Sequence, residues 1–162
     1  MVVAVIGAAV LVAAISVVLS SLRVTGRMAA LRHLQDHCGW VQFLINHEIE
    51  QAESASTTTA GELNLTVPGF TNKPTIIYRL NTDTHRLLRT GPGIDLQGRL
   101  MASSEPVSDL VARDVEAFDV TVTNPRSPRY RLTIKDTGGN TYTLTQDDGR
   151  NGGAYCRARD IN

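Results

Sequence analysis

The sequence predicts an α+β fold in which one long N-terminal helix packs on an antiparallel β-sheet head. Residues 1–22 contain no charged residue and no histidine, and apolar residues then recur at helical spacing to about residue 54. Beyond that point the hydrophobic period changes to two, as in strands. Strands that gather after a single helix are typical of α+β proteins. Three segments are therefore expected: a transmembrane half-helix (1–22), an amphipathic half-helix (23–54) and a globular β-rich head (55–162).

The first segment has the length of a membrane span. Residues 2–19 are apolar apart from one serine, and as a helix they cover about 28 Å at ~1.5 Å per residue, close to a ~30 Å hydrocarbon core. The run is longer than a signal-peptide core, and no small-residue cleavage site follows it. A buried soluble helix and a cleaved signal peptide remain the alternatives. Basic residues follow the span and none precedes it, so the positive-inside rule retains the head in the cytoplasm unless the given chain lacks a basic leader.

The amphipathic segment carries two apolar faces. One is a stripe within an arc of about 80°, suited to packing on a sheet; it comprises Leu31, Leu34, Cys38, Val41, Ile45, Ile49 and Ala52. The other lies on the opposite side and comprises Trp40, Phe43 and Leu44. One small head needs only one stripe, so the second face predicts contact with neighbouring helices. An ordinary exposed patch, or a loop covering it, is the alternative.

The head divides into short elements. A polar loop is expected over residues 54–61 and a strand over 75–80, which returns after a turn as a strand over 86–90. The Gly91-Pro92-Gly93 run ends that strand. A short helical turn is expected at 108–112 and a strand at 115–123. Residues 130–135 and 141–145 form a clear hairpin, and 154–158 form a last edge strand.

Charge and cysteine content limit the function. The chain has 16 Lys and Arg against 16 Asp and Glu, all after Leu22, so no basic excess points to nucleic acid. The two cysteines, Cys38 and Cys156, are a disulfide candidate if the head is exported. Two buried free thiols are the other interpretation.

No residue pattern predicts catalysis or a cofactor. His33 and His37 share a helix face with Asp36 nearby, but no third metal ligand is evident and His47 is too far along the helix. Asp147, Asp148 and Asn151 offer oxygen atoms without EF-hand spacing. No nucleophile elbow is present, and Gly91-Pro92-Gly93 lacks the residues of a phosphate loop. The sequence therefore predicts a protein that is not an enzyme and binds neither metal nor cofactor.

Several segments resemble the superfamily of type IV pilins and type II secretion pseudopilins. Residues 1–15 are similar to the core of the N-terminal helix of these proteins. The body is most similar to the J-type minor pseudopilins and W-type minor pilins, moderately over residues 76–122; the similar segments are Tyr78-Arg79-Leu80, Leu88-Arg89-Thr90-Gly91-Pro92, Gly98-Arg99-Leu100 and residues 110–120.

The resemblance implies a structural filament subunit with a lollipop shape. Such subunits are held in the inner membrane by a single span with the head in the periplasm, and assembly machinery moves them into a filament at the cell surface or in the periplasm. Other pilin or pseudopilin subunits, that machinery and membrane lipid are the implied partners. Small residues would let filament helices approach closely; they are Gly7, Ala8, Ala9, Ala13 and Ala14.

This sequence departs from the family at its start. The peptidase site and the glutamate shortly after it are absent, and Met1 falls several residues into the family's mature helix. The expected explanation is a late start or a truncation, which would also account for the missing basic leader. A single-pass anchored periplasmic binding domain that does not polymerise is the alternative function, and a membrane-tethered enzyme is a third.

Overall fold

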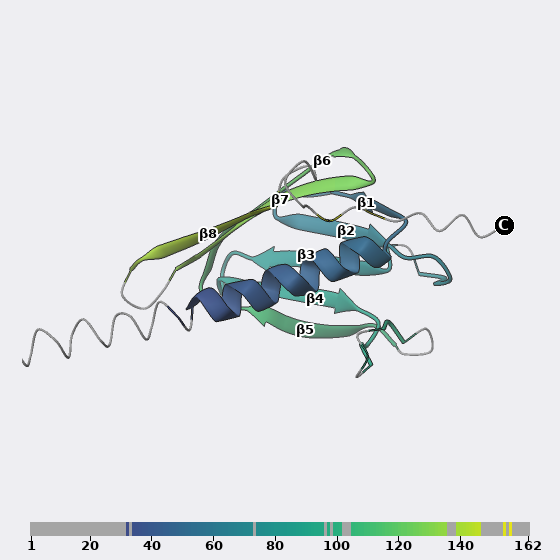
Figure 1. Cartoon of the computed structure of the whole chain (residues 1–162), viewed down its shortest axis with the longest axis horizontal. Helices are drawn as coiled ribbons and strands as arrows, with labels where there is room; N and C mark the ends of the chain where they lie inside the picture. Colours follow the sequence, from purple (N-terminus) through teal and green to yellow (C-terminus); the bar gives the residue numbers. More distant parts are fainter. Residues whose placement is uncertain are drawn as a thin grey trace, which may run out of the picture. The chain divides into compact units, whose positions relative to one another are not determined.

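The computed structural model describes residues 32, 34–72, 74–95, 97, 99–101, 105–135, 139–146, 154 and 156. The chain divides into two units, Met1–His37 and Cys38–Asn162. The second unit contains eight strands and the helix from Cys38 onward (Figure 1). Within the described residues the helix occupies residues 34–51.

The larger sheet has five antiparallel strands in sequential order. Each strand pairs with the next one along the chain, because a short turn can join two antiparallel neighbours directly. The strands are β1 (Ser54–Ser56), β2 (Glu62–Thr66), β3 (Ile76–Asn81), β4 (Arg86–Gly91) and β5 (Val107–Ala112). The β3–β4 pairing sets Tyr78 opposite Arg89, and Ile77 opposite Thr90.

The smaller sheet has three antiparallel strands, again in sequential order. In β7, Tyr130, Leu132 and Ile134 are buried and alternate with more exposed residues, as expected for a strand with one covered face. The strands are β6 (Val115–Asn124), β7 (Ser127–Lys135) and β8 (Thr141–Gln146). The Ala55 amide donates to the Pro125 carbonyl at 2.7 Å, so β1 lies against the β6–β7 turn.

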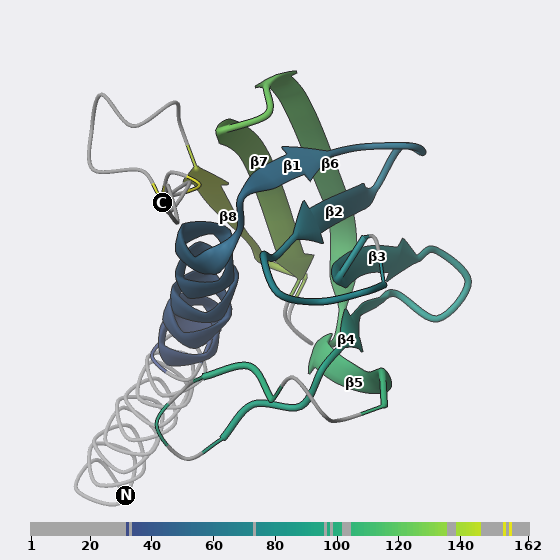
Figure 2. The same ribbon diagram turned by 90° about the vertical axis from the view of Figure 1, so that its right-hand side faces the viewer.

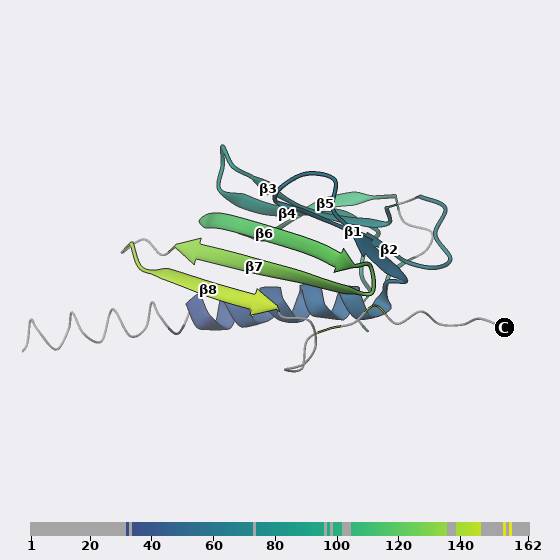
Figure 3. The same ribbon diagram turned by 90° about the horizontal axis from the view of Figure 1, so that it is seen from above.

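The two sheets form a curved wall, and the helix of this unit lies along one side of it (Figures 2 and 3). Four helix residues that share one face are fully buried: Cys38, Val41, Ile45 and Ile49. Ala52, directly after the helix, is also fully buried. They meet a core supplied by alternate strand positions, among them Leu63, Leu65, Ile76, Leu87 and Leu132. The spacing of these helix residues gives one apolar face, and burial of that face provides most of the stability of such a helix.

The predicted fold class is wrong in two respects. Within the part of the chain that the structure describes, the head is two sheets rather than one, and the fold is mostly antiparallel β with one short helix rather than a long helix on a small head. Over residues 34–51, the acidic residues Asp36 and Glu50 interrupt the apolar residues outside the buried face. That pattern makes a helix that covers a sheet and meets water on its other side.

The predicted membrane span and localisation are also corrected. Among the residues that the structure describes, no helix is long and apolar enough to cross a membrane. This finding contradicts the prediction of a single-pass inner-membrane protein with a periplasmic head. The segment 1–22, on which that prediction was based, lies outside the described residues.

Three expected head elements differ from the structure. The helical turn expected at 108–112 is strand β5, which pairs with β4. Its first four residues are exposed, so no period-two pattern marked it as a strand. The loop expected at 54–61 contains β1, and β2 follows it without having been predicted. The expected strand at 154–158 is described only at Ala154 and Cys156, and neither residue is in a strand.

Candidate interaction surface and pocket

The helix face predicted to pack on a sheet lies in the core. Cys38, Val41, Ile45 and Ile49 are fully buried, and Leu34 is half-buried. Leu31 lies outside the described residues. The face opposite this stripe is therefore the part of the helix that another molecule can reach.

A buried ion pair joins the helix to the larger sheet. Glu48 and Arg89 have side chains that are each 1% exposed; Glu48 Oε1 accepts from Arg89 Nε at 2.8 Å and lies 2.6 Å from Arg89 Nη2. The Tyr78 hydroxyl donates to the other carboxylate oxygen of Glu48. The guanidinium on one oxygen and the phenol on the other fix the carboxylate in place. The helix is thereby held to β3 and β4 by directional bonds as well as by apolar contact.

Electrostatics within this cluster favour the ion pair. Burial, together with the negative charge of Glu48, raises the pKa of Tyr78 well above its ordinary value, so the phenol stays protonated and donates. Burial by itself would lower the pKa of Arg89, but the hydrogen bond and charge of Glu48 outweigh it and the pKa is raised. The Arg89 guanidinium therefore keeps its charge, and the Tyr78 hydroxyl keeps its proton.

Arg89 also reaches beyond the helix. Its Nη2 donates to the Pro92 carbonyl at 2.9 Å, which fixes the chain just after β4. Its Nη1 lies 3.8 Å from a carboxylate oxygen of Asp109 on β5. That Nη1 is buried and has no hydrogen-bond partner among the described residues. One side chain thus connects the helix, β4, the following loop and the edge strand.

The opposite face of the helix presents aromatic side chains to the surface. Trp40 is 51% exposed and Phe43 is 67% exposed, whereas Leu44 is half-buried. The Phe43 ring stacks on the His47 ring with centroids 5.8 Å apart and planes 6° apart. A shallow depression of about 310 Å³ lies here, lined by Gly39, Gln42, Phe43, Asn46, His47 and Glu50. The small residues expected to pack in a filament lie outside the described residues: Gly7, Ala8, Ala9, Ala13 and Ala14.

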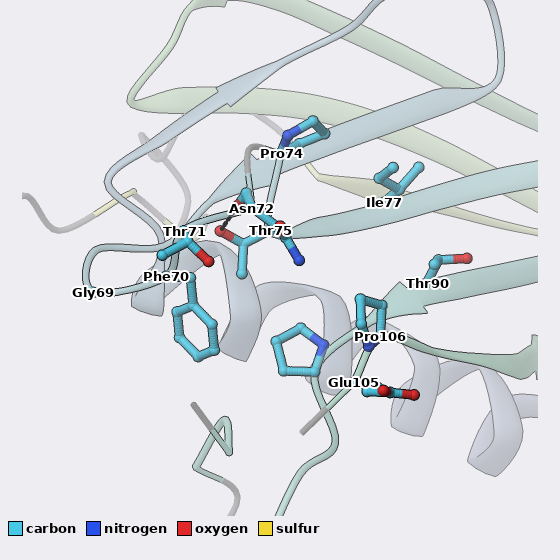
Figure 4. A pocket seen from close by; sticks show the side chains of 11 residues that line it. Gly69, Phe70, Thr71, Asn72, Pro74, Thr75, Ile77, Thr90, Glu105 and Pro106 are labelled. Atoms are coloured by element: carbon cyan, nitrogen blue, oxygen red, sulfur yellow. Dashed lines mark hydrogen bonds between the residues drawn. The ribbon is translucent and has the colours of Figure 1, made fainter. Parts of the chain in front are cut away.

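A larger pocket, of about 430 Å³, lies beside the end of β4 (Figure 4). It is lined by residues 69–72, 74 and 75 between β2 and β3, by Ile77 and Thr90, by Pro92, and by Glu105 and Pro106 before β5. Tyr78 and Arg89 point to the helix, so their strand neighbours Ile77 and Thr90 point to the other face of the sheet. The pocket thus has apolar and polar walls drawn from several parts of the chain.

A second carboxylate cluster lies in the β1–β2 turn. Glu62 accepts hydrogen bonds from Thr58, Asn64 and Arg79, and its carboxylate is 2.7 Å from Arg79 Nη2. The bond from Thr58, with those from Asn64 and Arg79, lowers the pKa of Glu62 to about 2, although burial opposes the shift. The cluster holds the turn that begins β2.

The two cysteines are both buried and both free. Cys38 belongs to the buried helix stripe, and the Cys156 amide donates to the Arg126 carbonyl at the β6–β7 turn. Burial raises the pKa of each thiol, to about 11 for Cys156. The structure thus contains the two unpaired thiols rather than the Cys38–Cys156 disulfide.

The structure describes some of the residues that the sequence offers as metal ligands. Within the described ranges, no group of three or more His, Cys, Asp and Glu residues is placed to hold a metal ion. His33 and the acidic loop of Asp147, Asp148 and Asn151 lie outside those ranges.

Sequence reasoning missed Glu48, Arg89 and the pocket. A signal for the first two was present, because Glu48 lies seven residues after Val41 and three after Ile45, on the buried stripe. In β4, Arg89 shares a face with the buried Leu87. An acid in one apolar stripe and a base in another indicate a buried pair. No sequence pattern indicated the pocket, because its lining comes from segments that are far apart in the sequence.

Comparisons of the chain with protein-family models, with curated proteins and with solved structures found no match.

Proposed function

We propose that this chain is a structural subunit of the pilin and pseudopilin class, which joins a filament through the exposed face of its helix. The observation that carries the proposal is the division of the helix into two faces. One face is buried in the core, while Trp40 and Phe43 on the other are 51% and 67% exposed. The resemblance of residues 1–15 and 76–122 to this class supports the same function.

The exposed face has the chemistry of a protein interface. Large aromatic residues are enriched at interfaces and often supply much of the binding energy. The stacking of Phe43 on His47 holds the ring in one orientation, which reduces the entropy lost on binding. A Cβ added at Gly39 would meet no atom within 4 Å, so a partner can approach the backbone there.

The bonds that attach the helix to the two sheets support a structural role. The bonds from Glu48 to Tyr78 and Arg89 join the helix to the larger sheet, and the Tyr130 hydroxyl donates to Asn46 from the smaller sheet at 2.9 Å. A contact made on the outer face of the helix is therefore transmitted to both sheets. A filament subunit needs a helix that is firmly attached to its head, because contacts of the helix set the position of the subunit in the filament.

Site-specific photocross-linking tests the proposal. A photoreactive residue replaces Phe43 in the full chain expressed in its native host, and the same residue replaces Leu110 in a control. Leu110 is a matched site, because it is apolar, 40% exposed and on β5 rather than on the helix. We expect position 43 to give cross-linked ladders of subunits and position 110 to give few.

The substitutions Trp40→Ser and Phe43→Ser extend the test. Together they should reduce incorporation into filaments, while Leu110→Ser leaves it unchanged. Equal cross-linking from both positions would contradict the use of this face. A chain that stays monomeric in the host would instead favour a binding domain that does not polymerise.

A further inference from the structure

We propose that the pocket beside β4 binds a saccharide of one or two rings through the side chains of Phe70, Asn72, Thr90 and Glu105. Its volume of about 430 Å³ lies within the ~300–1,000 Å³ typical of small-molecule sites. The pocket lies apart from the exposed helix face, so this inference does not depend on filament assembly.

The walls of the pocket are held in place by bonds within the protein. Thr75 is buried; its hydroxyl accepts from the Val67 amide at 3.0 Å and lies 3.3 Å from the Asn72 carbonyl, to which it donates. Its amide donates to the Leu65 carbonyl at 2.8 Å. On the other side, the Pro92 carbonyl is held by the buried Arg89. A site with fixed walls loses little entropy when a ligand binds.

Close packing under the pocket reinforces this rigidity. A Cβ at Gly91 would lie 3.2 Å from both Ile76 Cγ1 and the Thr75 carbonyl oxygen, so β4 approaches the start of β3 more closely than a larger residue allows. Three prolines, Pro74, Pro92 and Pro106, line the pocket and restrict the backbone around it. The lining is therefore largely preformed.

The polar groups of the lining suit hydroxyl-rich ligands. The side chains of Asn72, Thr90 and Glu105 line the pocket and make no hydrogen bond with the described part of the chain. The amide of Asn72 projects toward the middle of the labelled side chains (Figure 4). An amide and a hydroxyl both donate and accept, and a carboxylate accepts, so together they match the hydroxyl groups of a sugar.

An apolar surface lies beside these polar groups. Phe70, which is half-buried, and the proline rings supply an apolar surface for the C–H face of a sugar ring.

The backbone under the pocket favours a saccharide over an extended peptide. Ile77 lies on β3, between β2 and β4, and Thr90 lies on β4, between β3 and β5. Each strand is already paired on both sides, so the floor offers no free strand edge. An extended peptide gains affinity from such an edge by strand addition, whereas a saccharide needs only side-chain groups.

Ligand-observed saturation-transfer NMR on the full chain tests the inference. The probes are D-glucose, N-acetyl-D-glucosamine and cellobiose, with D-sorbitol as the open-chain equivalent that lacks a ring. We expect transfer to at least one of the saccharides at about 10 mM, with weaker transfer to sorbitol. The Asn72→Ala variant should weaken binding about fivefold, as expected for the loss of one hydrogen bond.

Aromatic variants provide the matched control. Phe70→Ala should weaken saccharide binding about tenfold, while Phe43→Ala, at an exposed ring on the helix, should leave it unchanged. Several results would overturn the inference: no transfer to any of the three saccharides, equal transfer to sorbitol, or an equal effect of Phe43→Ala. Binding of a proline-rich peptide without saccharide binding would also reject it.

Discussion

At the scale of single residues, Glu48 and Arg89 occupy an environment that charged side chains seldom enter. Each is 1% exposed, and Glu48 is the nearest charge partner of Arg89. Glu48→Gln keeps the shape of the side chain but leaves the buried Arg89 charge with only the exposed Asp109 carboxylate, 3.8 Å away. We expect the free energy of unfolding to fall by about 3–5 kcal/mol, measured by urea denaturation.

A double substitution separates the pair from its packing. Glu48→Leu combined with Arg89→Met replaces two charges by apolar groups, so it should be less destabilising than Glu48→Gln alone. If Glu48→Gln changes the free energy of unfolding by less than about 1 kcal/mol, the pair does not hold the helix.

Glu62 makes the free energy of unfolding depend on pH, and this effect can be tested separately. Its pKa in the folded protein is about 2, below the ordinary 4.5. Its contribution to stability is therefore fully present above pH 4.5 and is lost as the pH falls toward 2. We expect Glu62→Gln to flatten the fall in the free energy of unfolding over this range, measured by denaturation at several pH values.

Glu116 provides the control for Glu62. Its carboxylate lies 3.7 Å from Lys135, but both side chains are about half exposed, so water screens the pair. Glu116→Gln should leave the acid limb of the stability curve nearly unchanged. An equal effect of the two substitutions would show that general surface charge, not the Glu62 cluster, causes the pH dependence.

At the scale of elements, the helix has one face that is buried in the core and one face that is exposed. Ile45→Ala removes buried methyl groups from the core and should lower the free energy of unfolding by about 2–5 kcal/mol. Phe43→Ala lies on the exposed face and should change it by less than about 0.5 kcal/mol. Thermal or urea denaturation of the two variants measures the difference. A large loss with Phe43→Ala would mean that its face is part of the fold.

Elements with a regular pattern were predicted well, and those without one were not. The β7–β8 hairpin coincides with the residues expected for it, because Tyr130, Leu132 and Ile134 alternate with polar neighbours. Strand β5 has no such alternation, since it lies at a sheet edge and exposes its first four residues. Its strand character comes from pairing with β4, which no local pattern records.

At the scale of the whole molecule, the division into two sheets is a tertiary property. Only Arg113 and Asp114 separate β5 from β6, a spacing that commonly joins a hairpin. Here Asp114 has a positive φ of 57°, and the Val115 amide donates to the His85 carbonyl, so the chain turns into a second sheet. The local sequence does not indicate whether β6 joins the first sheet or starts a second one, because that outcome depends on contacts with distant residues.

The sequence by itself determined the buried face of the helix, the β3–β4 and β7–β8 hairpins and the turns within them. Hydrophobic period and turn chemistry are local, so they can be read along the chain. Only the tertiary structure decided the two-sheet arrangement, the pairing of Glu48 with Arg89, and the pocket that Phe70, Asn72 and Glu105 share. These features need residues that are distant in sequence to meet, and that meeting is set by the packing of the whole core rather than by any one segment.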